Sequence, residues 1–149
     1  MANGFSDYVE NKVIDWVFRG QTMPGAMTTL YFALHTADPG DTGASGVSTS
    51  GTAYARQSFT GGLSNFGSTS NTTGSASTGT TGNTKNKVAI TWAAGPAGSN
   101  WGTVSFWSVW DTSTAGNCLA SGALTTNKTI NVGDPGPSFA IDALSFTLD

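Results

Sequence analysis

Residue types that carry catalysis are few in this chain of 149 residues, and their spacing does not assemble a site. His35 is the only histidine, so a Ser-His-Asp or Cys-His arrangement would have to use it. No acid or nucleophile lies at a spacing from His35 that is typical of such an arrangement. The nine acidic residues are dispersed, and Glu10 is the only glutamate. We therefore predict that His35 is a structural residue within a strand and that the chain is not an enzyme.

Metal and cofactor binding are also poorly supported by the residues. Asp38 and Asp41 could hold Ca²⁺ through a turn, but the Asp-rich alternation of a calcium loop is absent, so we expect a plain turn. Cys118 is the single cysteine, which excludes an internal disulfide or a thiolate cluster, and we expect it to be a small buried strand residue. No glycine-rich phosphate loop is present. The sequence predicts no cofactor and no metal.

The charge pattern argues against nucleic acid and membrane partners. The net charge is -3, and the six Lys and Arg residues are scattered, whereas phosphate neutralisation needs clustered cations. No secretory segment and no apolar run of membrane length is visible. We expect a protein that is made and assembled in a cytosol.

The segment from Leu30 to Asp41 organises the predicted fold. Leu30, Phe32 and Leu34 alternate with a second, largely apolar set, which predicts a central strand covered on both faces, by a second sheet or by the preceding helix. Asp38, Pro39 and Gly40 then predict a tight turn. With 20 glycines and only 10% charged residues, the composition predicts a β-rich protein. The length predicts a single domain spanning residues 1–149.

One helix is predicted near the start, over residues 6–19, with Ser6 as its N-cap and Gly20 after its end. Its apolar stripe is expected to lie on a sheet, and consists of Phe5, Tyr8, Val9, Val13, Trp16 and Val17. Ile14 and Phe18 form a second apolar patch on the opposite side. Two interpretations stay open: the patch folds under the following loop, or it meets another chain.

The remaining chain predicts strands joined by long loops. Residues 60–86 are mostly Gly, Ser, Thr and Asn and are expected to be a surface excursion, although a Ser/Thr ribbon pairing with neighbours is possible. Strands are expected at 53–59, 88–92, 101–110, 118–124, 128–132 and 139–148, the last with a bulge near Ala143. In the aromatic run, Val104, Phe106 and Trp110 are predicted to share one face, with Trp107 and Val109 on the other. This pattern favours a β-sandwich or jelly-roll-like fold with one N-terminal helix.

Several motifs together resemble a family of small tailed-bacteriophage virion proteins, whose members are described as tail-fibre proteins or as capsid decoration (cement) proteins. The motifs are the N-terminal helix ending at Gly20, LYFALHTADPGDTG, YAR, WGTVSFW, GALT and GDPGPSFAIDALSFTLD. The similarity covers nearly the whole chain except residues 60–86, which look like a loop insertion. The resemblance implies a structural role and carries over no catalytic residue.

The resemblance, read with the composition, predicts a cement protein on the capsid surface of the virion, assembled in the bacterial host cytoplasm. Such proteins oligomerise, usually as homotrimers, and clamp the major capsid protein by burying apolar surface. We expect Ile14, Phe18 and the exposed member of the pair Trp107 and Trp110 at subunit or capsid contacts. The alternative is a tail-fibre or baseplate domain that recognises a host surface glycan. Five tryptophans could line a glycan platform, although such rings more often fill a core or an interface.

Overall fold

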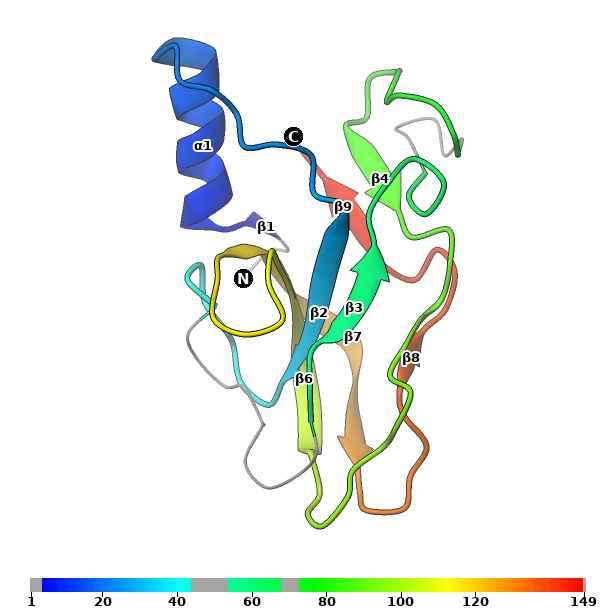
Figure 1. Ribbon diagram of the computed structural model, residues 1–149. Helices are drawn as coiled ribbons and strands as arrows, with labels where there is room; N and C mark the ends of the chain where they lie inside the picture. The colour runs from blue at the N-terminus through cyan, green and yellow to red at the C-terminus, as the bar shows by residue number, and fades with distance from the viewer. Residues whose placement is uncertain (1–3, 44–53, 68–72, 149) are drawn as a thin grey trace.

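The computed structural model describes residues 4–43, 54–67 and 73–148, and these are mainly β-sheet with one helix (Figure 1). Its elements in chain order are β1 (Gly4–Phe5), α1 (Asp7–Phe18), β2 (Thr29–His35), β3 (Gln57–Thr60), β4 (Asn83–Lys85), β5 (Ile90–Thr91), β6 (Gly102–Trp110), β7 (Cys118–Ile130), β8 (Ser138–Phe139) and β9 (Ser145–Thr147).

The strands form two layers around one large apolar core. The first layer is a five-stranded antiparallel sheet in the order β1-β7-β6-β2-β3. The second consists of two short pairs, β4-β9 and β5-β8, whose Ile90, Phe139 and Phe146 pack against the same core as Phe32 and Trp107 of the large sheet. The predicted β-sandwich-like fold is confirmed.

Strand β2 lies inside the large sheet, between β6 and β3, as predicted. Phe32 and Leu34 face the main core. Ala33, on the opposite face, belongs to a smaller cluster with Trp110 and Cys118. This second face is covered by the turn that follows β2, and not by a sheet or by α1: Gly43 lies so close to Trp110 that an added Cβ would come within 2.5 Å of its ring.

The long strand β7 replaces the two short strands predicted at 118–124 and 128–132. Both halves pair with β6, but the register shifts by three residues, because Val104 lies opposite Lys128 whereas Phe106 lies opposite Ala123. An odd shift exchanges the two faces of a strand. The predicted grouping of Val104 with Phe106 and Trp110 is therefore wrong: Val104 packs in the main core with Trp107 and Val109.

Residues 60–86 were expected to be a surface excursion, and the structure corrects this at both ends. Phe66 packs edge-on against Phe59 at 5.4 Å between ring centroids and forms an isolated bridge with Asn86. Strand β4 pairs with β9 of the same chain. The alternative prediction, a ribbon that pairs with neighbouring strands, therefore holds for Asn83–Lys85. Residues 73–81 are exposed, and 68–72 lie outside the described residues.

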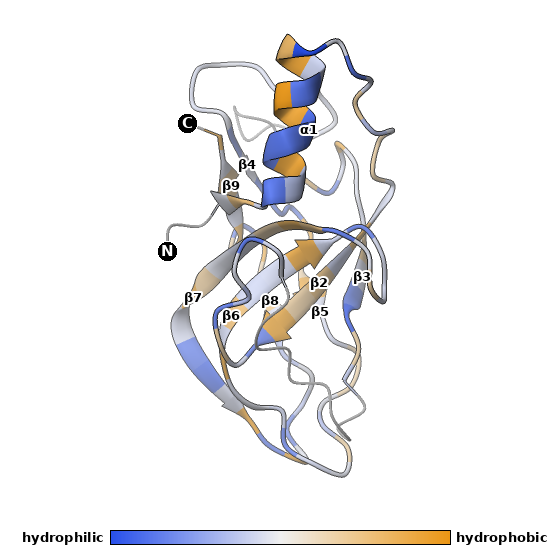
Figure 2. Ribbon diagram, turned by 90° about the vertical axis from the view of Figure 1, so that its left-hand side faces the viewer, coloured by the Kyte–Doolittle hydropathy of each residue, from blue (hydrophilic) through white to orange (hydrophobic). Residues whose placement is uncertain are grey.

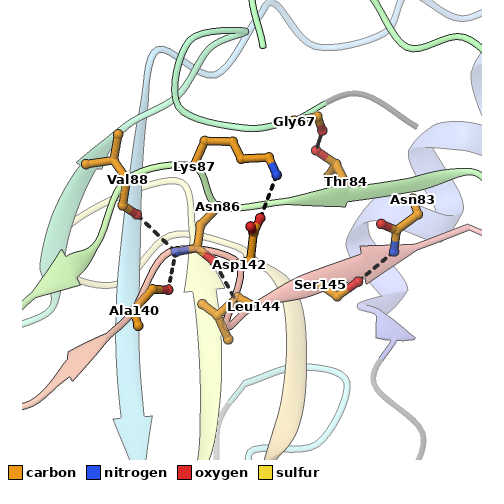
Figure 3. A network of polar contacts seen from close by, with 10 residues as sticks. All are labelled: Gly67, Asn83, Thr84, Asn86, Lys87, Val88, Ala140, Asp142, Leu144 and Ser145. Carbon is orange, nitrogen blue, oxygen red and sulfur yellow. Dashed lines mark hydrogen bonds and ion pairs between the residues drawn. The ribbon is translucent and has the colours of Figure 1, made fainter. Parts of the chain in front are cut away.

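Asn86 is a fully buried polar residue, and all of its amide and backbone groups find partners (Figure 3). Its Nδ2 donates to the carbonyl oxygens of Val88 (3.0 Å) and Ala140 (2.8 Å), and its Oδ1 accepts from the backbone nitrogen of Leu144 (2.9 Å). The Asn86 backbone carbonyl accepts from Asp142 (2.8 Å) and its N–H donates to Leu144 (3.3 Å). A satisfied amide at this depth fixes the path of the C-terminal segment.

This network explains why the closing strand is interrupted. The sequence predicted one strand over 139–148 with a bulge near Ala143, but β8 ends at Phe139 and β9 begins at Ser145. Between them Asp142 has a positive φ of 63° and its carboxylate pairs with Lys87 at 2.6 Å. In place of a strand ladder, Asn86 binds the carbonyl of Ala140, the backbone nitrogen of Asp142 and both backbone groups of Leu144.

Helix α1 begins and ends where the sequence predicted. Ser6 is its N-cap, and the Ser6 hydroxyl also donates to the carbonyl of Cys118, which ties the start of the helix to β7. Arg19 closes the other end, where its side chain pairs with Asp15 at 2.8 Å. The predicted packing is wrong, however: no residue of α1 is buried, and the helix stands at one end of the molecule, beside β1 and β7 and not across the face of the sheet (Figures 1 and 2).

Candidate interaction surface

His35 lies within the core and not in a catalytic arrangement. It is fully buried, and its Nε2 lies 2.6 Å from the hydroxyl oxygen of Ser108, which is fully buried on the neighbouring strand. The same hydroxyl accepts a hydrogen bond from the indole N–H of Trp110 at 2.7 Å. The prediction of a structural histidine is confirmed, because this polar chain lies inside the sheet and reaches no solvent.

The predicted turn and the predicted buried cysteine are also found. The Asp38 carboxylate accepts a hydrogen bond from the backbone of Gly40 at 2.9 Å, and Gly40 has a positive φ of 64°. Cys118 is buried in the smaller cluster, and burial raises the pKa of its thiol from 9.0 to about 11, so it is a weak nucleophile at neutral pH. Within the described residues, no group of three His, Cys, Asp or Glu side chains could hold a metal ion.

Trp107 and Trp110 do not offer an exposed ring for an interface. Trp107 is 3% exposed in the main core, where it meets Phe146 edge-on at 5.3 Å, and Trp110 is 5% exposed. The Arg56 guanidinium lies 3.6 Å above the Trp110 ring and donates to the carbonyls of Thr112 and Ala115, so it closes the following turn over this ring. Since neither ring is exposed, we leave both out of the candidate surface.

Ile14 and Phe18 lie on the surface, 49% and 80% exposed, and the linker after α1 does not cover them. Trp16 and Val17, which were assigned to the buried stripe, are 56% and 52% exposed. At 3.6 residues per turn, Ile14, Val17 and Phe18 lie on one side of the last turn and a half of the helix and Trp16 lies on another. The ion pair of Asp15 and Arg19, at 2.8 Å, occupies the side between Phe18 and Trp16. Large apolar side chains exposed together are unusual on a protein surface, so this helix end is the clearest candidate for a contact with another molecule.

The geometry at the base of α1 explains the exposure. Strand β1 has only two residues and pairs with the start of β7, at the edge of the large sheet. Helix α1 follows it directly and lies against these two strands. The helix is therefore anchored to the sheet at its start, while Trp16, Val17 and Phe18 at its far end stay exposed.

Two hollows lie beside the base of α1 and share Phe5. One, of about 380 Å³, separates the helix from the end of the chain and is lined by Val9, Glu10, Val13, Ile14, Leu148 and Phe5. The other, of about 260 Å³, opens between the two layers and is lined by Leu30, Phe66, Val109, Leu119, Phe146 and Phe5. We call the two hollows together the end groove. Its walls are mainly apolar, and their polar residues are Glu10, Thr84 and Thr147.

The sequence could have indicated part of this surface. Two apolar patches on opposite sides of one helix are a signal for more than one contact surface. The end groove had no such signal, since its walls come from β1, β2, β6, β7, β9 and the segment around Phe66, which meet only in three dimensions.

Comparison with known proteins gives one family. A family model described as podophage GP4 fiber I protein gp80 matches residues 4–147, which is nearly the whole chain, and no curated protein matches. The description names a phage fibre component; it supports the predicted virion protein and leaves the capsid decoration role unconfirmed. In the described part of the chain, no helix has the length and apolar character needed to cross a membrane. The chain belongs to the podophage GP4 fiber I protein gp80 family, a family of phage structural proteins.

Proposed function

We propose that this chain is a structural component of a podophage tail fibre. The observation that carries the proposal is the match of residues 4–147 to a family described as a fibre protein. The chemistry of the described residues agrees with a role in assembly: the lone histidine is part of a buried hydrogen-bonded core, and the most unusual surface is an apolar helix end.

Within a fibre, a chain can build the fibre or touch the host, and the structure favours the first role. Recognition of a glycan by aromatic stacking needs exposed rings, but Trp92, Trp101, Trp107 and Trp110 are all buried. Among the described residues, the exposed large aromatic side chains are Trp16 and Phe18, and both lie on α1. Host glycan binding is therefore the second candidate within the same fibre assignment.

The copy number of the chain per virion tests the fibre proposal. Quantitative protein analysis of purified particles against the major capsid protein is expected to give a few copies per hundred capsid subunits, because a tail carries few fibres. A ratio near one to one would overturn the proposal and would favour the capsid cement protein that the sequence predicted. Antibody labelling seen by electron microscopy is expected to mark the tail.

A competition experiment separates the two fibre roles. An excess of the isolated protein is expected to leave phage adsorption to host cells unchanged if the chain builds the fibre. Inhibition of adsorption, with binding to purified host polysaccharide, would instead assign the contact with the host to this chain.

A further inference from the structure

We infer that an extended segment of a neighbouring virion subunit pairs with the part of the β7 edge that β1 leaves free, and inserts side chains between the two layers. The inference goes beyond the fibre proposal, because it concerns how the chain is joined to its neighbour. It rests on the virion protein family and not on the choice between fibre and capsid.

The two long sides of the sandwich differ. On the β3 side the layers are joined, because the indole N–H of Trp92, after β5, donates to the carbonyl of Ala55, before β3, at 3.0 Å. On the other side, β7 lies at the margin of the large sheet (Figure 2), and hollows separate it from the second layer. We call the space between residues 122–130 of β7 and residues 137–145 the open side.

Main-chain groups line both rims of the open side. In the described part of the chain, residues 122–130 have β6 as their one strand neighbour, because β1 pairs only with Ala120 and Ser121. All of residues 123–129 except Leu124 are exposed. Strands β8 and β9 on the other rim also have one strand neighbour each. Unpaired strand edges are templates for another strand, so an extended polypeptide fits these rims and an acyl chain does not.

Two adjoining hollows between the rims can receive side chains. They share Leu124 and Phe139. The larger, of about 420 Å³, reaches Trp107 of the main core, and the smaller, of about 130 Å³, lies between Ile130 and Lys128. Side chains alternate between the faces of a strand, so every second residue of the inserted segment points into these hollows. We expect apolar residues at these positions and an acidic residue near Lys128.

Strand β1 shows how this side of the sandwich accepts a strand. It pairs antiparallel with the start of β7 and packs Phe5 against the main core. Phe5 lines a small hollow together with Trp107 of the large sheet and Phe146 of β9, so its ring lies between the two layers. The inserted segment continues the line of β1 along the rest of β7 and repeats this arrangement.

Hydrogen exchange tests whether the edge is covered in the assembled particle. Amides in residues 122–130 are expected to exchange at least about tenfold more slowly in purified virions than in the isolated chain, because pairing removes them from water. Equal exchange in the two samples would overturn the inference.

Ala123→Pro tests whether the cover is a paired strand. The carbonyl of Leu119 accepts from the nitrogen of Ser6 at 3.1 Å, and alternate residues turn their backbone groups the same way, so Ala123 turns its N–H to the open side. Proline removes this donor and leaves the ladder with β6 in place. The matched control Ala123→Ser keeps the N–H.

Particles produced with each variant as the only source of the chain give the readout. Incorporation relative to the major capsid protein is expected to fall at least about tenfold for Ala123→Pro and to stay native for Ala123→Ser, because only the first loses a main-chain bond to the partner. Near-ultraviolet circular dichroism and thermal unfolding of the isolated variants check that both fold. Native incorporation of a folded Ala123→Pro chain would mean that strand pairing is wrong.

Copy number decides the fibre proposal separately. A ratio near one to one with a protected β7 edge would overturn the fibre proposal and support the inserted strand. A few copies per hundred capsid subunits with equal exchange would do the reverse.

Discussion

Strand β6 and helix α1 are both rich in large apolar residues, yet the first is mostly buried and the second has no buried residue. Strand β6 lies between β7 and β2, and its two faces pack on the main core and on the smaller cluster. Helix α1 is attached to the sheet edge by its first turn. Both segments are therefore apolar enough to be buried. Whether their own chain buries them depends on where each is attached to the sheet.

Two tryptophans give the largest expected difference between these regions. Trp107→Ala removes a buried ring from the main core and is expected to lower the free energy of unfolding by about 3–5 kcal/mol. Trp16→Ala removes an exposed ring and is expected to change it by less than about 0.5 kcal/mol in the isolated monomer. Urea unfolding followed by circular dichroism measures both values. A large loss for Trp16→Ala at low protein concentration would mean that α1 packs on its own chain.

The second largest loss of stability is expected at Asn86. This buried polar residue holds the C-terminal segment of the second layer in place. Asn86→Ala removes the side-chain partner of the buried backbone nitrogen of Leu144 and of the partly buried carbonyls of Val88 and Ala140, and is expected to cost about 2–4 kcal/mol. Asn83→Ala is the matched control, since its amide bonds to Ser145 and Thr147 are exposed; it is expected to cost less than about 1 kcal/mol. Equal losses for the two variants would contradict a special role for the buried amide.

The smallest effect is a loss of stability at high pH. It comes from two buried groups, the thiol of Cys118 in the smaller cluster and the hydroxyl of Tyr54 beside the main core. Burial raises the pKa of the Cys118 thiol from 9.0 to about 11 and that of the Tyr54 hydroxyl from 10.0 to about 12. Between those values the unfolded chain has lost the proton and the folded chain retains it, so stability falls as pH rises. The contribution of Cys118 is complete below pH 9 and is lost by pH 11.

Chemical denaturation at pH 8, 9, 10 and 11 measures this slope. For Cys118 a difference of two pKa units corresponds to about 2–3 kcal/mol across the window. Cys118→Ala is expected to have a shallower slope than the native chain from pH 9 to 11. Identical slopes for the two proteins would mean that the thiol is not buried in the folded state.

Local sequence patterns predicted the elements whose signals lie within a few residues. The alternation of Leu30, Phe32 and Leu34 identified an interior strand, and Ser6 and Gly20 marked the ends of the helix, because the period of the backbone and the capping groups are local properties. The same local logic predicted a structural histidine at His35 and a turn at Asp38, and the structure contains both.

Only the tertiary structure decided which of these surfaces are covered. The shift of register between β6 and β7 moved Val104 to the other face, and Asn86 interrupted the closing strand, through contacts between residues far apart in the sequence. The same holds for α1: its sequence determined an amphipathic helix, but its attachment at the sheet edge left Trp16, Val17 and Phe18 exposed. Burial depends on which segments meet, and a one-dimensional pattern does not contain that information.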